Sequence, residues 1–143
     1  MLLTASILAC SAEMRALHRQ TKARTELAEV AGDYWTAVRW GDAAKLGGFY
    51  AAPEDQLAVA RVSGSTPFKV SDASIVQIVV GGELPKDREP DTREGVALVR
   101  LEAYDIRRNR LEVSEVEQHW LYREPRGWIV DVAKSPVGAE RAW

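Results

Sequence analysis

The chain has 143 residues, of which 46% are hydrophobic, and it carries a net charge of -2. A domain of this length buries roughly 68–70% of its unfolded surface, so it needs no metal or disulfide to hold a core, and we predict neither metal nor cofactor. The acidic balance excludes an electrostatic nucleic-acid-binding surface, and the single cysteine excludes an intrachain disulfide and a multi-cysteine zinc site.

The first ten residues form a short apolar stretch that ends in Cys10. A helix that spans a bilayer needs about 20 apolar residues, so this stretch is too short to do so. Residues 7–10, Ile-Leu-Ala-Cys, resemble the lipobox of a bacterial lipoprotein signal peptide, although no Lys or Arg precedes the apolar run. The resemblance implies lipid attachment at Cys10 and a membrane-anchored protein that faces the periplasm, with a cytoplasmic location as the alternative.

A second interpretation of the same region is an ordinary amphipathic helix. The residues Leu3, Ile7, Cys10, Met14 and Leu17 recur at spacings of three and four, which is the period of one helical face. Cys10 would then be a small buried side chain. We therefore interpret residues 1–24 either as a signal-like N-terminus with a linker or as a helical extension.

A helix is clearly indicated over residues 27–38, because apolar side chains recur on one stripe: Leu27, Val30, Ala31, Tyr34 and Val38. Gly41 can adopt the left-handed conformation that ends a helix, and Asp42 is placed to cap a second helix over residues 43–50. A third helix is predicted over residues 53–62, with a proline in its first turn.

The pattern changes to strands after residue 63, with strands predicted over residues 75–80, 96–104 and 111–123, followed by a last one. In the third strand, Leu111 and Val113 have one parity and Val116, Trp120 and Tyr122 the other. A β-bulge near Ser114-Glu115 would reconcile the two sets. Residues 84–94 are predicted to be a solvated loop.

Four of the five tryptophans lie in residues 34–42 and 118–131, so the end of the first helix and a late hairpin are expected to meet. The turn Glu124-Pro125-Arg126-Gly127 places Trp120 and Trp128 on adjacent antiparallel strands. We predict a structural corner that contains Arg39, Trp40, Asp42 and Trp128, in which Arg39 and Asp42 hold the helix to the hairpin. Burial in a core explains these aromatic residues better than ligand stacking does.

Helices are followed by strands, and the chain carries these motifs: Tyr-Trp-x-x-x-Arg-Trp-Gly-Asp at residues 34–42, Phe49, Pro53-Glu54, Gln118-x-Trp120-x-Tyr122 and Trp128. In this order and in these motifs the chain resembles the nuclear transport factor 2-like (SnoaL-like) superfamily, in particular its small uncharacterised bacterial lipoproteins. The resemblance implies an α+β, cone-shaped fold in which N-terminal helices pack on a curved antiparallel sheet of about four strands. The domain would span residues 25–136, followed by a tail over residues 137–143. The candidates for lining its pocket are Tyr34, Trp35, Tyr50, Trp120 and Tyr122.

Enzymes of this superfamily use Asp, His or Tyr side chains that project into the cone. Here His119 has the parity opposite to that of Trp120, Asp131 is expected to be an outward or edge residue, and Tyr34 is best explained as core, so we assign no catalytic residue. We therefore expect a non-catalytic envelope domain that acts as an accessory or protein-binding module, with a protein partner or as a homodimer. The alternatives are a binder of a small apolar ligand in the cone pocket and an isomerase, cyclase or dehydratase.

Overall fold

Three helices precede four strands in the computed structural model, which describes residues 4–82 and 92–137, with side chains from residue 12 onward. The elements are α1 (Thr4–Trp40), α2 (Ala43–Gly47), α3 (Pro53–Ser65), β1 (Phe68–Gly81), β2 (Glu94–Asp105), β3 (Arg110–Arg123) and β4 (Gly127–Val130). This order confirms the predicted α+β class. The side chain of Cys10, most of the loop over residues 84–94 and nearly all of the tail over residues 137–143 lie outside the described residues.

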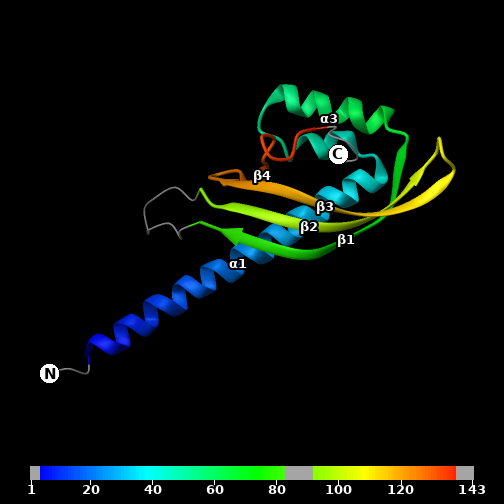
Figure 1. The fold of residues 1–143 in the computed structure, drawn as a ribbon. Helices are drawn as coiled ribbons and strands as arrows, with labels where there is room; N and C mark the ends of the chain where they lie inside the picture. The colour runs from blue at the N-terminus through cyan, green and yellow to red at the C-terminus, as the bar shows by residue number, and fades with distance from the viewer. Residues whose placement is uncertain (1–3, 83–91, 138–143) are drawn as a thin grey trace.

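The four strands form one antiparallel sheet in the order β1-β2-β3-β4, so every strand pairs with its neighbour in sequence. The sheet curves around α1, which crosses one of its faces and packs mainly against β1, while α2 and α3 lie beyond one end of the sheet (Figure 1). Register shifts interrupt β1 between Val70 and Asp72 and between Ile75 and Gln77. Such irregularities increase strand bending.

The bulge predicted in β3 is wrong. The strand pairs with β2 without a shift from Leu121, opposite Glu94, to Arg110, opposite Asp105. Its even-numbered residues therefore face inward throughout, which buries Glu112 and leaves Val113 53% exposed. The apolar pattern was misleading at this end of the sheet because Glu112 lies beside Arg108 and Arg110, at 3.8 and 3.4 Å, and is the inward residue.

The core lies between the buried face of α1 and the inner face of the sheet. The predicted stripe of the helix is confirmed, because Leu27, Ala31, Tyr34 and Val38 are buried and Val30 is partly buried. The strands contribute Val99, Leu101, Trp120 and Val130, and the segment after α1 contributes Leu46, Tyr50 and Val59.

Gly95 of β2 allows the closest approach of helix and sheet. A methyl group at this position would overlap Leu27 and would lie 3.1 Å from the ring of Trp128. The absence of a side chain at Gly95 thus lets α1 and the β3-β4 hairpin approach the same point of the sheet.

The corner between α1 and α2 forms as the sequence predicts. Gly41 adopts φ +67° and ends α1. The Asp42 carboxylate accepts a hydrogen bond from the backbone N–H of Lys45 at 3.0 Å, which caps α2. Helix α2 is shorter than predicted, since it ends at Gly47, and α3 is longer, since it continues to Ser65.

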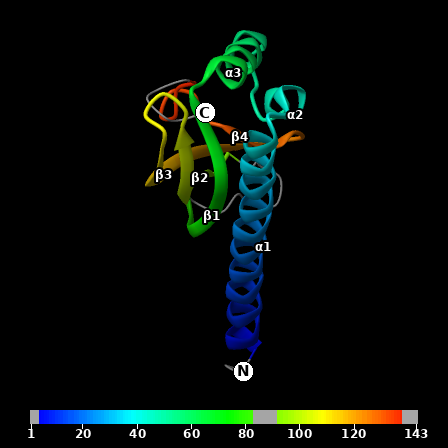
Figure 2. The same ribbon diagram turned by 90° about the vertical axis from the view of Figure 1, so that its right-hand side faces the viewer.

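Helix α1 extends far beyond the sheet. The part predicted without an alternative, residues 27–38, is only the C-terminal third of a helix that begins at Thr4, so the described part of residues 1–24 is a helical extension. This N-terminal part projects away from the sheet (Figure 2). From residue 12 to residue 22 every side chain except that of Ala16 is exposed, and Met14 and Leu17 are 69% and 63% exposed. Packing against the sheet begins at Ala23. Among the helices of the described chain, none combines the length and apolar character needed to cross a bilayer.

Candidate functional site

The predicted meeting of the first helix with the hairpin is confirmed by an interior aromatic cluster. Tyr34 of α1 lies at its centre, with its ring centroid 5.3 Å from that of Trp35, 5.4 Å from Phe49 and 5.8 Å from Trp120, each in an edge-to-face arrangement. Edge-to-face pairs place the positive rim of one ring on the negative face of another. The cluster thus occupies the space between the helices and β3 with aromatic side chains.

Two hydrogen bonds fix the polar groups of this cluster. The hydroxyl oxygens of Tyr34 and Tyr50 are 2.8 Å apart, and the indole N–H of Trp35 donates to Oε1 of Gln118 at 3.0 Å. Burial is the main cause that raises the pKa of Tyr34 well above its ordinary value and that of Tyr50 to about 12. Both phenols are therefore neutral near pH 7, where one hydroxyl donates this hydrogen bond to the other and neither acts as a base.

Tyr122 lies apart from the other four pocket candidates. Its ring packs edge-to-face on Trp128 at 5.3 Å, with the guanidinium of Arg93 over it at 5.5 Å. The structure therefore brings Tyr34, Trp35, Tyr50 and Trp120 together, and it adds Phe49, which the candidate set did not include.

The hairpin is held to the helix corner by Arg126, and not by Arg39 and Asp42 as the sequence suggested. The Nη2 atom of Arg126 donates to the carbonyl oxygens of Tyr50 at 2.7 Å and of Gly48 at 3.3 Å. The guanidinium of Arg39 instead lies over the ring of Trp40, at 5.6 Å. Arg126 occupies the turn between β3 and β4, where only Pro125 and Gly127 carry a conformational signal in the sequence.

His119 and Asp131 line a cavity that Trp120 of the aromatic cluster also lines. The volume of this cavity is about 210 Å³. His119 has the parity opposite to that of Trp120 along β3, and the cavity is also lined by Lys134 and Glu94, which form an ion pair at 3.1 Å. Asp131 directly follows the edge strand β4, but it is buried, so the prediction that it could point outward is wrong: its carboxylate accepts from the N–H of Ala133 at 3.2 Å and forms a turn. Within the residues that the structure describes, no three His, Cys, Asp or Glu side chains gather as a metal site would require.

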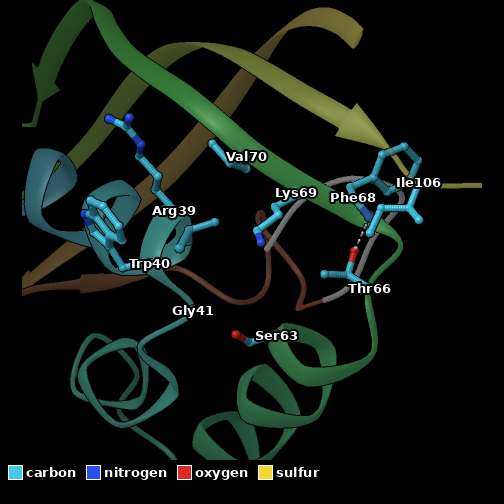
Figure 3. A pocket seen from close by; sticks show the side chains of 10 residues that line it. Arg39, Trp40, Gly41, Ser63, Thr66, Phe68, Lys69, Val70 and Ile106 are labelled. Carbon is cyan, nitrogen blue, oxygen red and sulfur yellow. Dashed lines mark hydrogen bonds between the residues drawn. The ribbon is translucent and has the colours of Figure 1, made fainter. Parts of the chain in front are cut away.

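A different cavity, of about 340 Å³, opens at the end of the molecule where α1, α3 and β1 meet the turn between β2 and β3 (Figure 3). We call it the corner pocket. Ten residues line it: Val38, Arg39, Trp40, Gly41, Ser63, Thr66, Phe68, Lys69, Val70 and Ile106.

The corner pocket combines exposed apolar groups with positive charge. Trp40 is 75% exposed and Ile106 is 60% exposed, so each presents a large apolar surface to solvent. The basic side chains of Arg39 and Lys69 are among the lining residues, and none of the ten is acidic. The side chain of Trp40 is therefore not buried between α1 and the β3-β4 hairpin, so it does not belong to a packed corner with Trp128.

Local contacts shape the walls of this pocket. The N–H of Phe68 donates to Oγ1 of Thr66 at 3.2 Å, and the N–H of Ile106 donates to the carbonyl of Pro67 at 3.1 Å. These bonds hold the start of β1 beside the β2-β3 turn. The sequence gives a partial signal for the pocket, because Arg39 and Trp40 fall outside the buried stripe at the end of the helix, but nothing near Lys69 indicates it.

Comparison with known proteins adds no relative to this description: the chain matches no protein-family model, no curated protein and no solved structure.

Proposed function

We propose that this chain is a non-catalytic binding domain of the bacterial cell envelope, that it has a nuclear transport factor 2-like fold, and that it binds a protein partner at the corner pocket. The observation that carries the proposal is Trp40, a tryptophan 75% exposed at the mouth of a cavity. Large exposed apolar groups beside polar ones are typical of interaction sites, and Trp and Arg are the residues most often responsible for binding energy there.

The charges of the pocket indicate the chemistry of the partner. With Arg39 and Lys69 among the lining residues and no acidic one, the pocket suits a segment that carries a carboxylate beside an apolar side chain. A planar guanidinium recognises a carboxylate with two parallel hydrogen bonds. A homodimer remains the second candidate, in which the same pocket would receive a segment of another copy.

The interior supports binding over catalysis. Its two tyrosines have raised pKa values and bond to one another, and aromatic rings occupy the space that a ligand of the cone would need. These facts weigh against the two alternatives, a small apolar ligand in the cone and an isomerase, cyclase or dehydratase.

Site-specific photo-crosslinking in intact bacteria tests the proposal. A photoreactive phenylalanine analogue placed at Trp40 is expected to yield a discrete adduct with one other protein, and the adduct should weaken when Lys69→Glu is added. The matched control carries the analogue at Val113, which is 53% exposed on the outer face of the sheet. Equal labelling from both positions, or no adduct from residue 40, would contradict the proposal; an adduct of twice the chain mass would identify a homodimer.

The envelope location has a separate test. Membrane fractionation followed by mass spectrometry of the natively expressed protein is expected to show an N-terminal Cys10 carrying acyl chains. A protein that retains Met1 and an unmodified cysteine would exclude the anchor and favour the cytoplasm.

A further inference from the structure

The second half of β1 differs in composition from the other two long strands. None of residues 73–82 is charged, whereas β2 contains four charged residues and β3 five. Five of the nine residues from Ala73 to Gly81 are Val or Ile, which have a high preference for strands. Uncharged segments that are rich in β-branched residues and lack proline pair readily with further copies of themselves.

This strand also lies at an edge of the sheet. The order β1-β2-β3-β4 leaves β1 paired on one side only within the described chain, and Figure 1 shows it along one margin of the sheet. An edge strand presents a row of backbone N–H and C=O groups to which another strand can bond. The opposite edge strand, β4, has only four residues, and a short edge strand is one means by which proteins prevent such pairing.

The first part of β1 is protected in other ways. Two register shifts interrupt its pairing with β2, the second of them between Ile75 and Gln77, and Lys69 and Asp72 add charge. Bulges and charged side chains both hinder the approach of a further strand. From Gln77 to Gly81 the pairing with β2 continues without a shift, and these five residues carry no charge. We call Gln77–Gly81 the open edge segment.

The open edge segment has apolar side chains on both faces of the sheet. Val79 is 49% exposed on the outer face, whereas Val80 is buried in the core. Ile78 is partly buried and packs against the same core. A strand added beside this segment would therefore meet apolar side chains on the outer face and would extend the core on the inner face.

We propose that the open edge segment pairs antiparallel with the same segment of a second copy of the chain, so that the two sheets join into one. A two-fold axis is the commonest symmetry of homo-oligomers, and it brings a surface against its own equivalent. Pairing about the central residue places Val79 opposite Val79 of the second copy. Because the segment is uncharged, no like charges face each other across the axis, and a net charge of -2 gives little repulsion between two copies.

This contact leaves the corner pocket accessible. Phe68, Lys69 and Val70 line that pocket, and they lie at the other end of β1 from Gly81. The edge contact is therefore distinct from a homodimer in which one copy inserts a segment into the corner pocket of another.

Sedimentation velocity of the purified full chain tests the inference. The protein carries Cys10→Ser, so that neither a disulfide nor an acyl chain joins two copies, and it is expected to pass from monomer to dimer as its concentration rises. Val79→Lys and Val79→Glu each place two like charges opposite one another and should raise the dissociation constant of the dimer about fivefold. An equimolar mixture of the two variants should restore dimer formation, because opposite charges then meet, and this result also shows that both variants fold.

Val113→Lys is the matched control. Val113 is 53% exposed on β3, a central strand, so the same charge is added at a similar exposure but away from either edge of the sheet. This variant should dimerise as the parent protein does. Trp40→Ala, which changes the corner pocket, should also leave the edge dimer unchanged.

A protein that remains monomeric at every concentration would overturn the proposal. Equal weakening by Val113→Lys, or a mixture of the Lys and Glu variants that fails to associate, would overturn it as well. A dimer that is lost in Trp40→Ala and retained in Val79→Lys would place the contact at the corner pocket instead, and fibres in place of a discrete dimer would reject the two-fold arrangement. Loss of the adduct at residue 40 would reject only the protein-binding proposal, so the two failures are distinguishable.

Discussion

Tyr34 and Tyr50 share a hydrogen bond and are fully buried. The free energy of unfolding should therefore decrease at alkaline pH, where their hydroxyls would have to ionise. Burial is the first cause that raises the pKa of each hydroxyl, for Tyr50 to about 12. An unfolded tyrosine ionises near pH 10. The contribution of the pair is therefore fully present below pH 10 and is lost as the pH rises from 10 toward 12, by about 1.4 kcal/mol per pH unit for each tyrosine.

Urea unfolding followed by circular dichroism checks this expectation at several pH values between about 9 and 11. The control is the double variant Tyr34→Phe, Tyr50→Phe, which retains Tyr104 and Tyr122 and should lose the part of the slope that the pair causes. A decline of equal slope in the two proteins would assign the alkaline sensitivity to other groups.

Removal of the Arg126 side chain is expected to destabilise the fold, because this side chain joins the β3-β4 turn to the segment after α2. Its guanidinium donates to the carbonyl oxygens of Gly48, Tyr50 and Ala51 in the segment after α2. Arg126→Ala should therefore lower the free energy of unfolding by about 1–3 kcal/mol. Arg126→Lys should recover only part, since an ammonium cannot reach several carbonyls in a plane. Arg123→Ala is the matched control, because Arg123 bonds only the carbonyl of its neighbour Tyr122, and should change stability by less than about 0.5 kcal/mol.

At the scale of elements, α1 contacts the sheet at Gly95, so the effects of substitutions at Gly95 and Leu27 on the free energy of unfolding should be coupled. Gly95→Ala is expected to destabilise the protein by about 1–3 kcal/mol, because the new methyl group overlaps Leu27 and presses on Trp128. In a Leu27→Ala background the same substitution should cost less, since the space is then open. Denaturant unfolding of the four proteins gives the coupling, and additive effects would argue against a close approach at this point.

The elements themselves are largely predictable, because periodicity reports burial. Leu27, Ala31, Tyr34 and Val38 are buried as their spacing predicts, and Gly41 and Asp42 end one helix and begin the next for local reasons. Apolar periodicity gives no information about a helical segment whose side chains are exposed. Over the first part of α1 the sequence offers a helix as only one of two interpretations, and the buried face expected there does not form at its described positions, since Met14 and Leu17 are exposed.

The errors at the candidate site have the same origin. In β3, Leu111 is exposed and Glu112 is buried, because Arg108 and Arg110, four and two residues before Glu112, lie beside its carboxylate; the apolar pattern takes no account of such ion pairs. The partner of the helix corner was assigned to Arg39 because it lies near in sequence, whereas Arg126 is 76 positions from Tyr50. Contacts of this range follow from the register of the strands and not from local spacing.

For the whole molecule, the projecting N-terminal part of α1 before Ala23, which we call the arm, and the packed remainder, which we call the body, should be separable. Apart from the partly buried Ala16, the described side chains that a deletion of residues 1–19 removes are exposed, and the deletion leaves the packed part of α1 from Ala23 onward. We expect the free energy of unfolding to change by less than about 1 kcal/mol, since isolated helix gains little stability in water. A loss of several kcal/mol in denaturant unfolding would show that the arm packs on the body.

The bond between Trp35 and Gln118 has a consequence for how the protein is made. Its two ends are 83 positions apart, and a ribosome adds roughly 5–20 residues per second. Roughly 4–17 s therefore pass between the synthesis of Trp35 and that of the strand that covers it. During this interval the indole N–H of Trp35 lacks its acceptor on β3, so the final closure of the core waits for that strand, although β1 is available earlier to cover much of α1.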